Sequence, residues 1–306
     1  MTQKDELNRA DILLVALVTV SWGLTYPVTK FGIRDFPPLT FRALSLIIGI
    51  VFLAAFMIFR GQGIGLIRRE IYPVFRSGFF NIALWQIGMV YGVLYLNSGR
   101  AAILGYTMPV WAFLASILFY RATPTWRGSI GVVLALSAIV MLAMNDWQSF
   151  LNSPVGFLAI IGGAISWGIG TAMVRNTPLK ASNESLTLWS LICGFLVMAT
   201  LACLFEADRW RIPNFGETLA ILYGGVFSFT LCYVIWFQLT RRLPPVVSSL
   251  SIMMVPVIGV MSSVVTLGEQ LTVLDMLALL LILTAMAVVL LPARLWKSRR
   301  LGRGPY

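Results

Sequence analysis

The sequence predicts an all-α, polytopic membrane protein, with ten transmembrane helices in two inverted five-helix repeats around a central cavity. Three observations predict this fold class. Ten separate stretches are long and apolar enough to cross a bilayer, and short motifs of the first half recur in the second. In addition, hydrophobic residues make up 58% of the 306 residues and charged residues only 11%, whereas a water-soluble domain carries about 25% charged residues.

Each predicted helix is a stretch of roughly 20 mostly apolar residues, the length that crosses the hydrocarbon core of a bilayer. In the first half, these stretches lie near residues 11–33, 39–59, 72–95, 100–120 and 126–144. In the second half, they lie near residues 154–174, 185–205, 217–239, 244–266 and 272–292. The connections are short, so no soluble catalytic or regulatory domain is expected. We expect one integrated transmembrane domain, with residues 1–148 as the first repeat and 149–306 as the second.

The chain lacks the residue patterns of enzymes and metalloproteins. It contains no histidine, which excludes a Ser-His-Asp triad and a histidine-ligated metal site. No aspartate cluster marks a membrane-embedded prenyltransferase, and the glycines of residues 61–65 lack the strand and Lys-Ser pair of a phosphate-binding loop. The three cysteines lie inside predicted spans without the close pairing of a disulfide framework or zinc site. We therefore expect no enzymatic activity, no cofactor and no metal.

The basic residues are distributed unevenly between the two sides of the membrane. The net charge is +11, and 17 of the 23 Lys and Arg residues fall on the side that holds both termini. Because cytoplasmic loops carry the excess of Lys and Arg, we expect both termini in the cytoplasm. The basic tail at residues 296–300 is expected to anchor the last helix to anionic lipid rather than to bind nucleic acid. The first apolar stretch lacks a signal-peptide cleavage site and is expected to remain in the mature protein.

Two motif correspondences relate the halves. The Ser-Trp-Gly triplet at residues 21–23 recurs at residues 166–168, 145 positions later. A pair of small residues ahead of a proline occurs at residues 101–102 and again at residues 248–249, 147 positions later. Five crossings separate equivalent helices, so the second half enters the membrane from the opposite side. Inverted repeats of this kind give transporters two access states around one midplane site; a gene duplication without mechanistic meaning is the alternative.

Several aromatic residues lie too deep in their spans to belong to the interfacial belts. An indole N–H there has no headgroup or water to bond unless it faces a polar interior. The deep tryptophans are Trp22, Trp85, Trp111, Trp167, Trp189 and Trp236. Other rings stand at predicted helix ends, where interfacial rings are common: Tyr72, Trp126, Trp147, Trp210 and Trp296.

These deep rings, together with amide and hydroxyl side chains on the same helix faces, predict a substrate chamber. Its predicted residues are Trp22, Tyr26, Asn81, Trp85, Tyr106, Trp111, Trp167, Thr171, Tyr233 and Trp236. Prolines in equivalent helices are the candidate gating kinks: Pro109 and Pro256. The alternative for each residue is ordinary packing, because small residues beside large ones also let transmembrane helices approach closely.

Acidic residues are absent from the centres of the predicted spans. Ionisable groups in mid-membrane cost about 2.5 to 3.5 kcal/mol and are kept where ions or protons travel, so we expect neither a multidrug-cation nor a proton-relay design. The substrate is expected to be neutral or zwitterionic. Its carboxylate could meet helix N–H groups or a basic residue near the outer side, although interfacial anchoring is the favoured role for those basic residues, namely Lys30, Arg42 and Arg100.

With these features, and with Leu-Gly-Glu-Gln-Leu at residues 267–271, the chain resembles the EamA-type branch of the drug/metabolite transporter superfamily. The equivalent place in the first half reads Phe-Tyr-Arg at residues 119–121 and departs from that pattern. Smaller members carry a glutamate in the first span that this chain lacks, so proton-for-cation antiport does not carry over. The resemblance implies ten helices around a central cavity in a bacterial inner membrane, in a protein that works as a monomer.

The combined prediction is an alternating-access exporter of amino acids, aromatic or otherwise neutral, or of similar small metabolites. The aromatic interior is similar to that of an amino-acid exporter of the superfamily. The expected partners are a small-molecule substrate and membrane lipid, without nucleic acid. The alternatives are a carrier of another metabolite class, such as a sugar phosphate, a nucleotide sugar or a drug, and a non-transporting membrane receptor or assembly protein.

Overall fold

The structure, a computed structural model, describes residues 9–145, 154–242 and 245–291, and these residues form helices and connecting loops without a strand. The first half contains α1 (Arg9–Gly32), α2 (Pro38–Phe59), α3 (Arg68–Gly78), η1 (Phe79–Leu84), α4 (Trp85–Tyr95), α5 (Ser98–Gly105), α6 (Met108–Tyr120) and α7 (Trp126–Asn145). The second half contains α9 (Val155–Asn176), α10 (Asn183–Phe205), η2 (Ala207–Arg209), α11 (Phe215–Leu222), η3 (Tyr223–Leu231), α12 (Cys232–Arg242), α13 (Pro245–Leu267) and α14 (Val273–Leu290).

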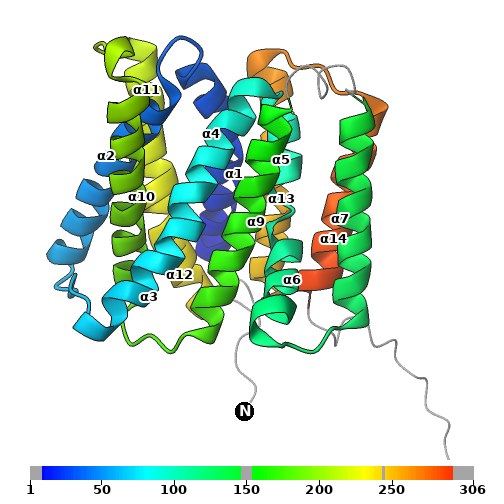
Figure 1. Cartoon of the computed structure of the whole chain (residues 1–306), viewed down its shortest axis with the longest axis horizontal. Helices are drawn as coiled ribbons and strands as arrows, with labels where there is room; N and C mark the ends of the chain where they lie inside the picture. Colours follow the sequence, from blue (N-terminus) through cyan, green and yellow to red (C-terminus); the bar gives the residue numbers. More distant parts are fainter. Residues whose placement is uncertain (1–8, 146–153, 243–244, 292–306) are drawn as a thin grey trace, which may run out of the picture.

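The helices form the predicted membrane-spanning bundle (Figure 1). Among the described residues, nine helical stretches are long and apolar enough to cross a membrane. The remaining predicted span corresponds to α13, in which Ser251–Leu267 is counted as a shorter apolar helix. The predicted starts agree closely with the observed ones, and the largest difference is at the third span, expected at residue 72 and found at Arg68. The all-α, polytopic fold class is therefore confirmed.

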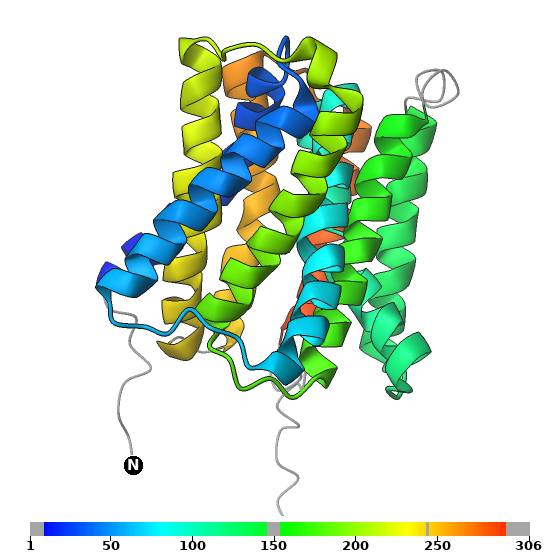
Figure 2. The same cartoon turned by 60° about the vertical axis from the view of Figure 1, so that its left-hand side comes forward.

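The two halves run through the bundle in opposite directions. In Figure 1, α1 starts at the lower side, near the marked N-terminal end, whereas α9 ends at that side in the loop that leads to α10. We call the side on which α1 ends and α2 begins the outer face, and the opposite side the inner face. The helices pack mainly across the halves: α1 against α13, α2 against α10 and η3, α4 and α6 against α9, and α7 against α14. Figure 2 shows α2 crossing obliquely between α10 and the α11–η3–α12 helix.

Three of the spans are not continuous α-helices. The third and eighth spans each contain a π-helical segment, η1 and η3, whose starts at Phe79 and Tyr223 differ by 144 positions. This offset is close to that of the repeated motifs. The fourth span is broken at Tyr106 and Thr107, immediately before Pro109, whereas Pro256 lies inside the continuous helix α13. π-Helical segments are rare and occur frequently at functional sites, so both halves carry an irregularity at equivalent places.

The glycines of the repeated Ser-Trp-Gly triplet lie where helices of opposite halves cross. A Cβ atom on Gly168 would lie 2.6 Å from the backbone nitrogen of Ala112 and from the backbone carbon of Trp111, both on α6. A Cβ atom on Gly23 would lie 2.5 Å from the side chain of Ile258 on α13. Both glycines therefore allow a close helix approach, as small residues do in membrane proteins.

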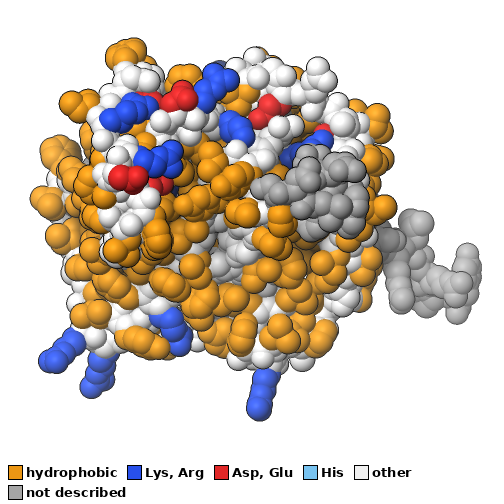
Figure 3. All heavy atoms as spheres, turned by 45° about the horizontal axis from the view of Figure 1, so that its top comes forward, with side chains coloured by type: hydrophobic (Ala, Val, Ile, Leu, Met, Phe, Trp, Pro, Cys, Tyr) orange, Lys and Arg blue, Asp and Glu red, His pale blue; other side chains and the backbone are white. Residues whose placement is uncertain are grey.

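Carboxylates of the second half cap helices of the first half at the outer face. Glu206 accepts hydrogen bonds from the backbone nitrogens of Leu39 (3.0 Å) and Thr40 (2.8 Å), at the start of α2. Glu269 accepts from the backbone nitrogens of Ser98 (2.7 Å) and Gly99 (3.1 Å), at the start of α5. Negative charge at a helix N-terminus satisfies free N–H groups and complements the helix dipole. Figure 3 shows acidic and basic side chains interleaved on this face.

The acidic residues thus lie near helix ends, as the sequence predicted, but many of them are buried rather than solvated. Several residues with a role predicted from the sequence lie outside the part of the chain that the structure describes. These are Trp147, the residues of the basic tail at 296–300 and, for their side chains, the Ser-Ser pair at 248–249.

Candidate functional site

Three of the predicted rings meet between α1 and α12. The rings of Trp22 and Tyr233 lie 5.7 Å apart in an edge-to-face arrangement, and those of Trp22 and Trp236 lie 5.8 Å apart. The Trp22 indole Nε1 donates a hydrogen bond to the carbonyl oxygen of Ser228 (3.3 Å) in η3. The deep indole therefore finds its polar partner on the backbone of the π-helical segment.

Four further predicted residues meet between η1, α4 and α9. The rings of Trp85 and Trp167 lie 5.8 Å apart, edge to face. The amide Nδ2 of Asn81 donates to the carbonyl oxygen of Trp167 (2.9 Å) and to Oγ1 of Thr171 (3.3 Å). Among the described residues, no donor bonds the amide oxygen of Asn81. A polar acceptor thus stands beside a pair of tryptophans in the middle of the bundle.

Tyrosines connect these two groups. Tyr26 lies one turn after Trp22 on α1, and the rings of Tyr26 and Tyr106 lie 6.4 Å apart. A Cβ atom on Gly105 would lie 2.8 Å from the Tyr26 hydroxyl and 3.1 Å from the Trp85 ring, so the two side chains converge there. Tyr106 and Tyr233 are both half-buried in the bundle.

Trp111 lies beside this cluster and bonds within its own span. Its indole Nε1 donates to Oγ1 of Thr107 (3.0 Å), at the break between α5 and α6, and its backbone packs against Gly168 of α9. Trp189, in contrast, donates to the carbonyl oxygen of Ile64 (2.7 Å) in the α2–α3 loop, which places its indole N–H at the inner end of the bundle. The loop carbonyl therefore accounts for the polar partner of Trp189, and this residue is not part of the ring cluster.

The three basic residues near the outer face turn inward, so their prediction as interfacial anchors is wrong. The Lys30 ammonium donates to the carbonyl oxygens of Val93 (2.7 Å), Leu94 (3.1 Å) and Leu96 (2.8 Å), where it caps the C-terminal end of α4. Arg100 forms an ion pair of 2.7 Å with Asp275, and both side chains are largely buried. The Arg42 side chain is only 1% exposed. The signal in the sequence was a cation inside a span, which usually marks an internal partner or a functional site.

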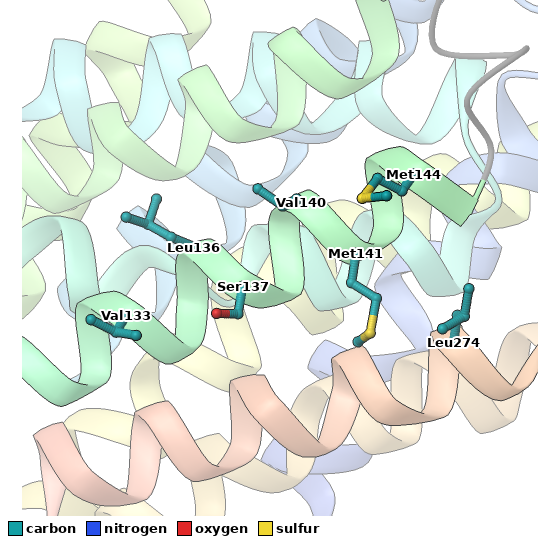
Figure 4. Close-up of a pocket in the computed structure, with 7 residues that line it drawn as sticks. All are labelled: Val133, Leu136, Ser137, Val140, Met141, Met144 and Leu274. Carbon is teal, nitrogen blue, oxygen red and sulfur yellow. The ribbon is translucent and has the colours of Figure 1, made fainter.

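Two hollows of the described structure lie at the surface of the bundle. One, of about 570 Å³, is an apolar groove on the outward face of α7, with Leu274 of α14 at its end (Figure 4). Five of its side chains are exposed on the outside of the bundle, so the groove faces lipid: Val133, Leu136, Val140, Met144 and Leu274. The other, of about 270 Å³, lies at the outer face between α2 and α4 and includes Arg34, Tyr91 and Glu206. The predicted chamber residues line neither hollow; in this conformation their rings pack against one another.

Metal-binding clusters are absent from the part of the chain that the structure describes: no three His, Cys, Asp or Glu side chains come together there. The residues that meet in the bundle offer ring faces, hydroxyls and one amide. These groups suit noncovalent recognition of a small amphipathic molecule.

Comparison with known proteins places the chain among membrane transporters. The model of the EamA-like transporter family matches twice, over residues 9–144 and 154–291. The chain is 26% identical to the uncharacterized transporter YoaV of Bacillus subtilis, over 89% of this chain and 93% of the relative. It is 25% identical to the uncharacterized inner membrane transporter YedA of Escherichia coli K12, over 92% and 90% of the two chains.

A third relative carries a more specific name. The chain is 27% identical, over 96% of its length and 99% of the relative, to a Salmonella typhimurium protein named "Probable amino-acid metabolite efflux pump". A protein of known crystal structure has the same fold, with a TM-score of 0.66 and 20% sequence identity over 95% of this chain and all of the other. Since the family model covers nearly the whole sequence, this chain is a multi-pass membrane transporter of the EamA-like family, within the drug/metabolite transporter superfamily.

Proposed function

We propose that this transporter exports amino acids, aromatic or otherwise neutral, or similar small metabolites from the cytoplasm. The observation that carries the proposal is the convergence of the Trp22, Tyr26, Trp85 and Trp167 rings with the Asn81 amide, from helices of both halves. Ring faces bind apolar and aromatic side chains. An amide oxygen without a protein donor accepts a hydrogen bond from an ammonium group.

The surrounding charges support a substrate without net charge. The carboxylates of Glu206 and Glu269 cap helix starts near the outer face. A cation or proton carrier would keep a carboxylate in mid-membrane. The Salmonella relative that is named an amino-acid metabolite efflux pump points to the same substrate class.

The proposed mechanism is alternating access. Residues 1–148 and 149–306 act as two inverted repeats, which the double family match supports, and their near-equivalence gives outward-open and inward-open states similar energies. In the present conformation, the carboxylate caps from the second half hold the outer face closed. Pro109, at the break in the fourth span, and Pro256, inside α13, are the proposed places of bending.

The proposal extends to the oligomeric state and the location of the protein. One chain already holds both orientations and therefore works as a monomer. It lies in the inner membrane of a bacterium with both termini in the cytoplasm, because the inner face carries the excess of basic residues. It binds its substrate noncovalently, uses no cofactor and binds no nucleic acid.

Transport in reconstituted liposomes tests the substrate class. Vesicles that contain the purified protein and are loaded with labelled phenylalanine, tryptophan, threonine or methionine are expected to release at least one of them faster than protein-free vesicles. Counterflow with unlabelled substrate separates a carrier from a receptor or assembly protein. Release of sugar phosphates or drugs, with none of the amino acids moving, would contradict the proposal.

The Asn81 amide provides a test of the site. Asn81→Leu keeps a similar volume and removes the polar acceptor, so it is expected to lower amino-acid transport by about tenfold or more, since a hydrogen bond to a charged group contributes about 1.5 to 3 kcal/mol. The matched control is Asn176→Leu, which removes an exposed amide at the inner end of α9 that bonds only the Ala172 carbonyl oxygen. Transport rates of the two variants are compared at equal amounts of reconstituted protein. Equal rates for Asn81→Leu and wild type would remove Asn81 from the site.

A further inference from the structure

Arg42 is a buried cation in the outer part of α2. It is the fifth residue of the helix, and its side chain is 1% exposed. An arginine this close to the end of a transmembrane helix ordinarily extends to the headgroups, because transfer of a charge into the apolar interior is costly. Arg42 instead extends between α1, α4 and η3, where it contacts Thr29, Met89 and Phe229.

The guanidinium makes few hydrogen bonds, and none of them is to an anion. Nη2 donates to Oγ1 of Thr29 (3.1 Å) and to the thioether sulfur of Met89 (2.9 Å). Nε is buried and has no hydrogen-bond partner. The rings of Phe41 and Phe229 lie 5.7 and 5.9 Å from Cζ. A guanidinium has five N–H donors and a thioether is a weak acceptor, so most of its bonding capacity is unused.

The acidic residues of the outer face do not neutralise this charge. Glu206 caps α2, Glu269 caps α5, and the Asp275 carboxylate pairs with Arg100 and accepts from the backbone nitrogen of Thr272. Within the described parts of the chain, Arg42 therefore has no carboxylate partner. Breaking a buried ion pair by removing the anion costs about 3 to 5 kcal/mol, so a buried arginine without an anion is a costly arrangement for structure alone.

Arg42 lies at the outer end of the ring cluster. Its guanidinium bonds Thr29, which lies one turn after Tyr26 on α1. Tyr26 in turn lies beside Tyr106 and converges with Trp85 at Gly105. A molecule among these rings would thus have a positive charge at its outer end and the free Asn81 oxygen on the α9 side.

We propose that Arg42 is the carboxylate-binding residue of this transporter, which takes the α-carboxylate of the exported amino acid on its guanidinium. The inference deepens the proposed function and depends on it. Guanidinium and carboxylate match as planar, bidentate partners, and the two contacts of Nη2, to a hydroxyl and a thioether, are ones that a carboxylate would replace. Because the guanidinium is enclosed in the present conformation, the carboxylate reaches it in the state of the transport cycle in which the packing around Arg42 opens.

Discrimination between an amino acid and its carboxamide tests this assignment. The assay measures counterflow of the amino acid that the wild-type protein carries best, with the unlabelled amino acid or its carboxamide as competitor. The wild type is expected to prefer the acid by about 10- to 100-fold, the ratio that corresponds to one charge-assisted hydrogen-bonded pair. Arg42→Met is expected to reduce this preference to less than about threefold, and Arg42→Lys to restore part of it, because lysine keeps the charge but not the bidentate geometry.

A matched control and a second readout distinguish binding from packing. Arg34→Met removes an exposed arginine of the same face and is expected to leave the preference unchanged. The thermal unfolding temperature, measured without substrate, is expected to be no lower for Arg42→Met than for wild type. The reason is that an apolar side chain of similar volume replaces an unneutralised buried charge.

The outcomes separate the two proposals. If the wild type carries amino acids but accepts the carboxamide equally well, or if the preference survives in Arg42→Met, the inference is overturned and the proposed function stands. Competition by inorganic phosphate or a sugar phosphate in place of carboxylates would also overturn it. If the wild type carries no amino acid, the proposed function fails and the carboxylate assignment fails with it.

Discussion

Gly168→Ala is expected to destabilise the protein far more than the same change at Gly162, six residues earlier on the same helix. A Cβ atom on Gly168 would lie 2.6 Å from backbone atoms of Trp111 and Ala112. Backbone atoms cannot move aside as a flexible side chain does, so α6 and α9 must separate. Overpacking of this kind costs typically about 1 to 3 kcal/mol. The two helices that would separate also carry Trp111 and Trp167, so transport should fall as well.

Gly162 is the matched control for this prediction. A Cβ atom there meets nothing within 4 Å, so Gly162→Ala is expected to leave stability unchanged or to raise it by up to about 1 kcal/mol through the better helix propensity of alanine. The measurement is thermal unfolding of the purified variants in detergent, together with the fraction of monodisperse protein. Equal melting temperatures for the two variants would contradict the close crossing of α6 and α9.

Arg100→Met is expected to cause the largest loss of stability among single substitutions at the outer face. The change leaves Asp275, which is 1% exposed, as a buried carboxylate without its ion-pair partner at 2.7 Å. Loss of one member of a buried ion pair costs about 3 to 5 kcal/mol. The pair joins the start of α5 to the start of α14, so its loss also weakens the contact between the two halves at the outer face.

A double variant distinguishes an unpaired charge from lost packing. Asp275→Asn in the Arg100→Met background removes the unpaired charge and keeps an acceptor for the Thr272 cap, so much of the stability should return. Arg209→Met, at an exposed arginine of the same face, serves as the control for a change of net charge and is expected to be neutral. If the Arg100→Met variant is as stable as the wild type, solvent rather than Arg100 compensates the charge of Asp275.

The spans were predictable because the bilayer constrains each of them separately. An apolar stretch of sufficient length forms a helix wherever water is excluded, because its backbone groups must bond within the segment. The starts of α2 and α7 could therefore be predicted to within one residue. The grouping of Asn81 with Trp85 followed from helical spacing, which is also a local property. The family resemblance added the ten-helix arrangement, and the family match bears it out.

The sequence did not predict which residues of different helices contact one another. Lys30 had the appearance of an interfacial anchor, because sequence shows how far a cation lies from a helix end but not which way its side chain turns. The π-helical segments η1 and η3 were also missed, since one additional residue in a turn leaves the apolar pattern almost unchanged.

The sequence by itself determined that this protein is a ten-span membrane transporter whose halves run in opposite directions, because hydrophobicity and a repeated motif are properties of the linear chain. Only the tertiary structure decided which rings meet, which carboxylates cap helices of the other half, and that Arg42 is buried without an anion among the described residues. These features depend on contacts between different helices, some of them more than a hundred positions apart in the sequence, such as Glu206 with Leu39 and Arg100 with Asp275. Their energies arise from burial and pairing across helices, which no local pattern records.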